Sequence, residues 1–349
     1  GKGSGAAIAA AIAAEIGDDE EVAGITLAFP QPDSPMQLLF GQYSGAPKVF
    51  CISSKSDLDQ QRKGPFLDKD MEVMCSDPTL SVKEVIDHIT ETYPVAYKCH
   101  KGLKPESPNQ DSFSVCIADN DFALYGVYDG HGPCGHHVSD KARLLLVEEF
   151  LRRREFAGVQ AAFDQAFRST QKYFEDLTAR SKARHFHGEE PFDASMSGTT
   201  ATMVYHDIGA QKLWVAHVGD SRAVLGWGGD QVKELTIDHK PDLPAERKRI
   251  ESLGGRVVFD GFFNHRVFSS KGMYPGLNMS RALGDCIGHA EAGLTAEPDV
   301  AMVDLSQYEG EVMLLLCTDG VWEFTESKEA VGMLQPQASS RTRTLSEQS

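Results

Sequence analysis

The tetrapeptide Asp129-Gly130-His131-Gly132 combines residue types that metal-assisted acid–base chemistry requires. A carboxylate and a glycine carbonyl are oxygen ligands of the kind that Mg²⁺ and Mn²⁺ prefer. An imidazole can donate a proton near neutral pH, and glycines let backbone and substrate approach closely. Taken alone, the tetrapeptide is more typical of an Asp-Gly turn with an incidental histidine, because short motifs have many false matches.

Three further aspartates lie where apolar segments begin or end, namely Asp111, Asp220 and Asp319. A carboxylate at the end of a buried strand is costly unless it is solvated, paired or bound to metal. Each could separately be a turn residue, and Gly219-Asp220-Ser221-Arg222 is a natural hairpin connection. Four such ends would repel one another without cations between them, so together they predict a divalent-cation site.

The elements that must position these aspartates begin near residue 95. Short apolar segments closed by turns predict buried strands at 112–118, 123–128, 200–205, 212–218, 222–227 and 312–317. Amphipathic periodicity predicts helices at 135–152, 159–183 and 244–253. Strands followed by paired helices favour an α+β layered sandwich. We therefore divide the chain into an N-terminal extension (1–94, with one helical pattern at 81–92), a folded domain (95–334) and a polar tail (335–349).

The composition of the 349-residue chain limits its partners. Its formal charge of −17, from 51 acidic and 34 basic residues, argues against nucleic acid or an anionic membrane surface. Seven cysteines without a Cys-x-x-Cys pair suggest neither a disulfide framework nor a zinc ribbon, which favours a reducing compartment such as the cytoplasm or nucleus. The apolar run at 6–16 is shorter than the about 20 residues that span a bilayer. We expect a monomer without a membrane span.

The order and the sequences of the motifs resemble those of the PPM-type protein phosphatases, also called protein phosphatase 2C. The sequence from Asp129 to Ser139 is most similar to the plant and protist branches. The matching segments are Asn109-Gln110-Asp111, Val127-Tyr128-Asp129-Gly130-His131-Gly132, Ser197-Gly198-Thr199-Thr200-Ala201, Val218-Gly219-Asp220-Ser221-Arg222-Ala223, Leu277-Asn278-Met279-Ser280-Arg281-Ala282-Leu283-Gly284-Asp285, Glu297-Pro298-Asp299 and Thr318-Asp319-Gly320-Val321-Trp322.

The resemblance implies a four-layer αββα sandwich of two antiparallel sheets flanked by helix pairs. It implies two Mg²⁺ or Mn²⁺ ions at one end of the sandwich, and a weaker third. A water held between two cations would attack phosphorus in line, without a covalent phosphoenzyme.

The resemblance also implies roles for single residues. Asp129 would bridge both metals, the Gly130 carbonyl would bind one of them, and Asp319 would bind the other. Asp111 with Gln110 would hold metal-bound water.

Three further assignments come from the same resemblance. His131 would be the general acid that protonates the leaving seryl or threonyl oxygen. Asp220 would be a ligand of the third metal. The stretch 238–285 would be the flap that borders the substrate groove.

The chain departs from the family's pattern in several places. Many members carry a phosphate-binding arginine shortly before the first motif, where this chain offers Lys101 or Lys104, which lack the planar fork of a guanidinium. Gln110 stands where many members have Glu. The family's metal-binding Asp-Asn pair near the end is absent, because no aspartate follows Asp319. We therefore expect a C-terminally incomplete domain without its last strand or strands.

Three hypotheses of function follow. The first is a metal-dependent phosphatase acting on phosphoserine and phosphothreonine in proteins. The second is a non-catalytic pseudophosphatase that binds partners, motivated by the missing terminal Asp. The third is a metallohydrolase for small phosphate esters.

Overall fold

A large sheet is the centre of the part of the chain that the computed structural model describes, which comprises residues 8–9, 25–27, 48–54, 69–102, 108–182 and 192–334. Its strands lie in the order β16 (Asp299–Asp304), β9 (Lys212–Val218), β8 (Ala201–Asp207), β6 (Phe122–His131), β5 (Asp111–Ala118), β3 (Val49–Ser54), β4 (Met71–Cys75) and β2 (Ile25–Leu27). All neighbours are antiparallel except β2 and β4. The short strand β7 (Gly198–Thr199) links the end of β6 to β15 (Leu283–Gly284).

A second sheet is built on β17 (Val312–Cys317), whose sequence VMLLLC is almost wholly apolar. It pairs antiparallel with β10 (Arg222–Trp227), which pairs in turn with β11 (Gln231–Glu234). On its other edge β17 pairs in parallel with β1 (Ile8–Ala9). Strands that are apolar throughout are buried on both faces, as expected for a sheet covered on two sides.

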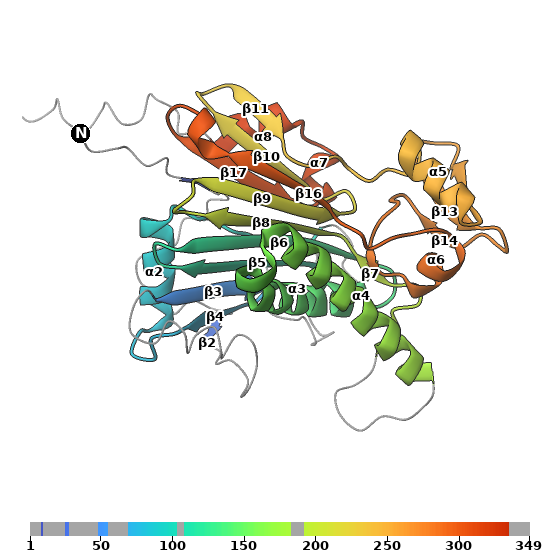
Figure 1. Cartoon of the computed structure of the whole chain (residues 1–349), viewed down its shortest axis with the longest axis horizontal. Coiled ribbons are helices and arrows are strands. Elements are labelled where there is room, and N and C mark those ends of the chain that lie inside the picture. The colour runs from blue at the N-terminus through green and yellow to red at the C-terminus, as the bar shows by residue number, and fades with distance from the viewer. Residues whose placement is uncertain are drawn as a thin grey trace, which may run out of the picture.

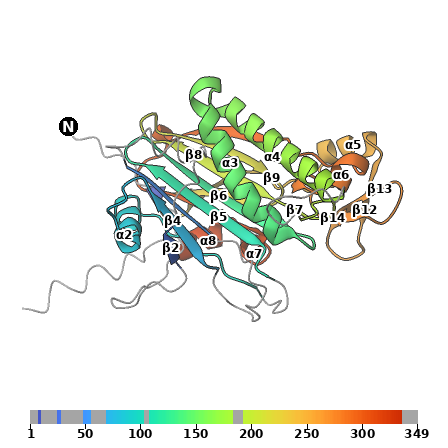
Figure 2. The same ribbon diagram turned by 90° about the horizontal axis from the view of Figure 1, so that it is seen from below.

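Two long helices, α3 (Gly135–Ala157) and α4 (Val159–Lys182), pack against each other and cover one face of the large sheet (Figures 1 and 2). Phe150, Phe163 and Phe167 are fully buried between the helices and the sheet. On the second sheet, α8 (Ser327–Leu334) packs Ala330 and Val331 onto β10 and β17. Each helix therefore buries one apolar stripe, as amphipathic periodicity requires.

A second core lies between the two sheets and contains Phe50, Val115, Leu225 and Leu314. Helix α2 (Val82–Thr92) closes one side of it and begins at a capping box, in which Ser81 and Glu84 satisfy each other's backbone N–H groups. The core thus joins elements from residues 49 to 314.

A smaller lobe projects from the end of the two sheets near β7 (Figure 1). It contains α5 (Pro244–Ser252), the three-stranded sheet of β12 (Gly255–Phe259), β13 (His265–Ser269) and β14 (Pro275–Leu277), and the short helix α6 (Cys286–Glu291). It coincides with the stretch that the sequence resemblance assigns to the flap.

The mixed α+β architecture with antiparallel sheets is confirmed. Each predicted strand and helix is present, with ends that differ by a few residues. The N-terminal boundary needs correction, however. β3 pairs with β5 along five residues, and β4 pairs with β3, so the large sheet includes residues before 95. Residue 95 marks where the motifs begin and not where the sheet begins. Within the described residues, no helix is long and apolar enough to cross a membrane.

Candidate active site

Two of the predicted aspartates meet because their strands are paired. Asp111 is the first residue of β5 and lies directly opposite Asp129 on β6. Like charges placed opposite each other destabilise an antiparallel pair, so hydrophobic pairing farther along the strands must hold this register. The backbone N–H of Asp129 donates to Thr200 Oγ1 at 3.0 Å, which fixes the end of β6.

The other two aspartates come from the second sheet. Arg222 on β10 pairs with Cys317 on β17, so Asp220, just before β10, and Asp319, just after β17, lie at the same end of that sheet. Thr200 Oγ1 also contacts Ser221 Oγ at 2.6 Å, which ties the two sheets together beside the four carboxylates. Asp111, Asp129, Asp220 and Asp319 are called the acidic centre below.

Within the acidic centre, burial and neighbouring carboxylates raise the pKa values of Asp129 and Asp319. Burial raises the pKa of Asp129 well above its usual value, and the charges of Asp111 and Asp319 raise it further. Burial raises the pKa of Asp319 as well, followed by the charge of Asp220. The carboxyls of Asp129 and Asp319 also affect each other's pKa directly, as two carboxyls do when they can share a proton. Such an arrangement favours either bound protons or bound cations.

Nearby polar groups offset only part of this repulsion. Burial raises the pKa of Asp111, while a hydrogen bond from Thr318 Oγ1, at 3.0 Å, and the Lys69 charge lower it. Lys69 Nζ donates to the carbonyl oxygen of Asp111 at 2.6 Å. Asp220 Oδ2 is paired with Lys240 Nζ, but Asp220 Oδ1 is buried and has no hydrogen-bond partner among the residues that the structure describes. That orphaned oxygen and the convergent carboxylates fit hard divalent cations.

His131 lies at the end of β6 and contacts a residue that the sequence analysis did not select. Its Nε2 lies 2.6 Å from Asp285 Oδ2, and its Nδ1 is buried. Burial lowers the pKa of His131, but the charge and hydrogen bond of Asp285 outweigh it, so the pKa is raised overall. An imidazole whose charged form is favoured by a neighbouring carboxylate is suited to donate a proton.

The remaining predicted residues lie around this centre. The Gln110 side chain donates from Nε2 to the Gly132 carbonyl at 2.8 Å. The backbone carbonyl of Gln110 accepts from the Gly130 N–H. Lys101 is buried and lines a cavity of about 520 Å³ together with Asp111, Thr318 and Gly320. Lys104 lies outside the described residues.

Lys69 and Lys240 were missed by the sequence analysis. Both are lysines in irregular segments, and no motif or periodicity distinguishes them there. Asp285 is the last residue of the motif Leu277–Asp285, and its sequence alone predicts no role for this residue.

A different group of side chains, His217, His239 and Asp299, has the composition of a metal site within the described residues. His239 Nδ1 accepts a hydrogen bond from the Gly219 N–H, so its proton is on Nε2, which faces Asp299. Binding a metal through Nε2 would require a proton on Nδ1, pointing at the Gly219 N–H. Asp299 is also paired with Arg281 at 2.8 Å. These groups are already satisfied by hydrogen bonds, and we interpret them as structural.

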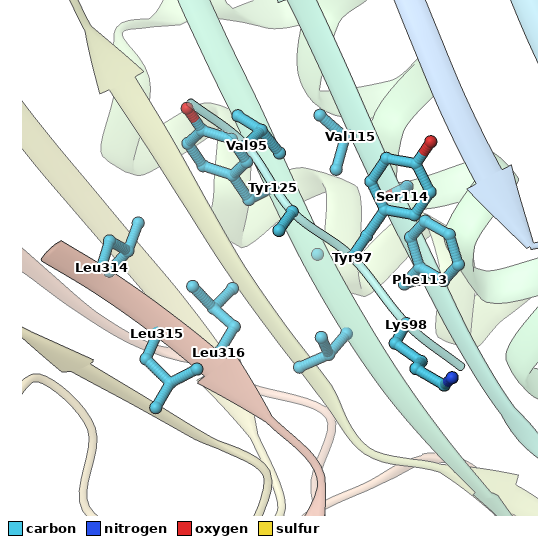
Figure 3. A pocket seen from close by; sticks show the side chains of 13 residues that line it. Val95, Tyr97, Lys98, Phe113, Ser114, Val115, Tyr125, Leu314, Leu315 and Leu316 are labelled. Atoms are coloured by element: carbon cyan, nitrogen blue, oxygen red, sulfur yellow. The ribbon is translucent and has the colours of Figure 1, made fainter. Parts of the chain in front are cut away.

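A small apolar cavity of about 70 Å³ lies between the sheets and is lined by Tyr97, Phe113, Tyr125, Leu314 and Leu316, among others. Figure 3 shows the β17 leucines opposite the side chains of Val95, Tyr97 and Tyr125. It carries no carboxylate, so it is a gap in the core and not a place for phosphate chemistry.

Comparison with known proteins gives consistent results. The family model described as Protein phosphatase 2C matches residues 102–349. "Probable protein phosphatase 2C 48" of Oryza sativa subsp. japonica is 36% identical over 246 residues, covering 64% of this chain and 68% of its own. "Probable protein phosphatase 2C 34" of Arabidopsis thaliana is 33% identical over 230 residues, covering 62% of this chain and 63% of its own, so the chain spans less than two thirds of that relative.

A similar solved structure is the serine-threonine phosphatase 2C from Toxoplasma gondii, with a TM-score of 0.51 and 21% identity, covering 64% of this chain and 77% of that one. At this identity the likeness concerns the fold alone. Because the family model covers well over half of the sequence, the chain belongs to the protein phosphatase 2C family.

Proposed function

We propose that this chain hydrolyses phosphoserine and phosphothreonine in proteins, in a reaction that depends on Mg²⁺ or Mn²⁺. The observation that carries the proposal is the convergence of Asp111, Asp129, Asp220 and Asp319 from two sheets into one mutually repelling group. Family membership supports the substrate class. The proposal includes action as a monomer in a reducing compartment, with which the seven free cysteines agree.

The acidic centre offers ligands for two ions and a weaker third. Asp129 would hold both, with the Gly130 carbonyl and Asp319 holding one each. Asp111 and Gln110 would orient water beside them. When bound, the ions supply a nucleophile at neutral pH and neutralise the charge of the transferred phosphoryl group. Asp220 would contribute to the third position, which it shares with the ammonium group of Lys240.

His131 would complete the reaction as general acid. As the phosphorus–oxygen bond breaks, its proton passes to the seryl or threonyl oxygen, leaving a neutral imidazole and a free alcohol. Burial lowers the pKa of His131, but the Asp285 carboxylate raises it overall, which favours the form of the ring that can donate a proton.

Lys101 would attract the substrate phosphate, since it lines the same cavity as Asp111. Lys104 keeps the same proposed role by its sequence position. An ammonium group supplies charge without a bidentate fork, so it would hold the phosphate less rigidly than an arginine.

The four-layer αββα arrangement is the part of the fold proposal that goes beyond the mixed α+β class. It is supported by α3 and α4 on the large sheet and by α8 on the second sheet.

The test is phosphopeptide hydrolysis by the purified protein with and without Mn²⁺. We expect Mn²⁺-dependent release of phosphate that Asp129→Ala abolishes and that Asp176→Ala, an exposed aspartate on α4, leaves unchanged. Metal-independent turnover, or full activity in Asp129→Ala, would overturn the proposal. A phosphopeptide must also be preferred to a small phosphate ester. Calorimetry with Mn²⁺ gives a second readout, because absence of binding would favour the non-catalytic module.

A further inference from the structure

Asp285 and His131 are 154 residues apart in the sequence and in direct contact in the fold. The distance from His131 Nε2 to Asp285 Oδ2 is 2.6 Å, and the Asp285 side chain is 1% exposed. A charge-assisted hydrogen bond of this length in a buried place is strong and directional.

The backbone holds Asp285 in an uncommon conformation. Its φ is 41°, in the left-handed region that residues other than glycine rarely adopt. Its N–H donates to the Ser197 carbonyl at 2.8 Å, and its own carbonyl accepts from the His289 N–H at 3.1 Å. Local propensity would not choose this conformation, so the surrounding contacts impose it, as is common where a side chain must be aimed.

The opposite wall leaves room for the pair. A Cβ atom placed on Gly198 would come within 2.1 Å of Asp285 Oδ2 and 2.7 Å of His131 Nε2. Any larger residue on β7 would therefore displace the contact. Glycine is needed here for close approach and not for backbone freedom.

His131 is the hydrogen-bond partner of the buried Asp285 carboxylate. In the described part of the chain, the hydrogen bond to His131 is the one that the Asp285 carboxylate makes, and Oδ1 is buried without a partner. A buried carboxylate is costly unless it is paired. The imidazole therefore supplies the compensation, and its ring is held in return.

We propose that Asp285 is the positioning residue of His131. It accepts the Nε2–H hydrogen bond and so fixes the orientation of the ring beside the acidic centre. This inference rests on the proposed function, in which His131 protonates the leaving oxygen. Asp285 touches neither the substrate nor the reacting atoms.

The first experiment compares two leaving groups in Asp285→Asn. With a phosphoseryl peptide the leaving alkoxide needs a proton, so we expect kcat to fall roughly 10- to 100-fold. With p-nitrophenyl phosphate the leaving phenolate is stable without one, so kcat should change less than about 3-fold. Asp299→Asn is the matched control, because Asp299 also faces a histidine, His239, but lies outside the acidic centre. It should show no difference between the two substrates.

Equal losses for both substrates, or no loss for either, would overturn the inference. Gly198→Ala provides a second variant, since it displaces the pair without changing either partner and should show the same dependence on the leaving group. If the wild-type protein hydrolyses neither substrate, the proposed function fails, but the positioning role is still tested by nitrogen-15 NMR of the His131 ring. The wild type should show the Nε2 signal of a ring hydrogen-bonded to a carboxylate, which Asp285→Asn shifts, and an unchanged ring signal would refute the positioning role.

Discussion

The acidic centre and the base of the flap use the same residue types with opposite results. At the flap base, Arg281 pairs with Glu246 and with Asp299, each at 2.8 Å, and Arg249 pairs with Glu246 at 2.7 Å. Burial raises the pKa of Glu246, but hydrogen bonds from Arg281, Arg249 and Ser280 more than offset this and hold it at about 2. We call Glu246, Arg249, Ser280, Arg281 and Asp299 the flap-base network.

In the acidic centre the pKa of Asp129 moves upward instead, because burial is joined by other carboxylates rather than by arginines. Buried charges that are paired hold two elements together, whereas buried charges that repel one another are stable only with a ligand. The comparison therefore separates buried carboxylates that arginines neutralise from buried carboxylates whose repulsion a bound cation would relieve.

The largest expected effect is on the flap-base network. Arg281→Met leaves Glu246 buried with fewer partners, and breaking a buried pair in this way costs about 3–5 kcal/mol. Urea denaturation should show a loss of this size, whereas Arg247→Met on the exposed side of α5 should lose less than about 0.5 kcal/mol. A loss below about 1 kcal/mol in Arg281→Met would mean that the network does not hold the flap.

The pH dependence of stability should come next in size. The pKa of Glu246 falls from 4.5 to about 2 on folding, so the folded state favours the ionised form. Its contribution, on the order of 3 kcal/mol, is present above pH 4.5 and is lost as the pH falls towards 2. The free energy of unfolding, measured from pH 5 to 2.5, should therefore fall more steeply with decreasing pH in the wild type than in Glu246→Gln. Parallel curves would contradict this.

Loss of a charge from the acidic centre should stabilise the metal-free protein, whereas loss of a charge from the flap-base network should destabilise it. Asp129→Asn removes the most strongly repelled carboxylate, so we expect the metal-free protein to melt at a higher temperature than the wild type. Mn²⁺ at 100 times its dissociation constant should stabilise the wild type by about 2.7 kcal/mol and the variant much less. Thermal melting with and without Mn²⁺ measures both. Equal stabilisation by Mn²⁺ in both proteins would count against the centre as the cation site.

The smallest effect sharpens the comparison from outside both regions. Lys83 and Asp87 on α2 form an exposed pair at 3.6 Å, with 72% and 46% of their side chains accessible. Lys83→Ala should cost less than about 0.5 kcal/mol in urea denaturation and leave phosphatase activity unchanged, because solvent screens such pairs. A loss comparable to that of Arg281→Met would show that burial is not what separates strong pairs from weak ones.

The sequence by itself determined the elements whose residues follow a regular pattern. Alternating or continuous apolar runs located β5, β6, β9, β10 and β17, and helical periodicity located α3 and α4. Asp129 and Asp319 could be selected because each lies within two residues of the end of such a run. The run at 49–54 is equally apolar, but it is short and lies among Gly- and Pro-rich segments, so its pairing with β5 was not predicted.

Tertiary structure alone decided which chain-distant side chains meet. Lys69 reaches Asp111, Lys240 reaches Asp220, and Asp285 reaches His131 across separations of 42, 20 and 154 residues. None of these contacts follows from a local period, since each depends on how the flap and the N-terminal segments dock against the sheets. Local propensity and periodicity decide where a strand forms. The partner of a buried charge is decided by the packing of whole elements.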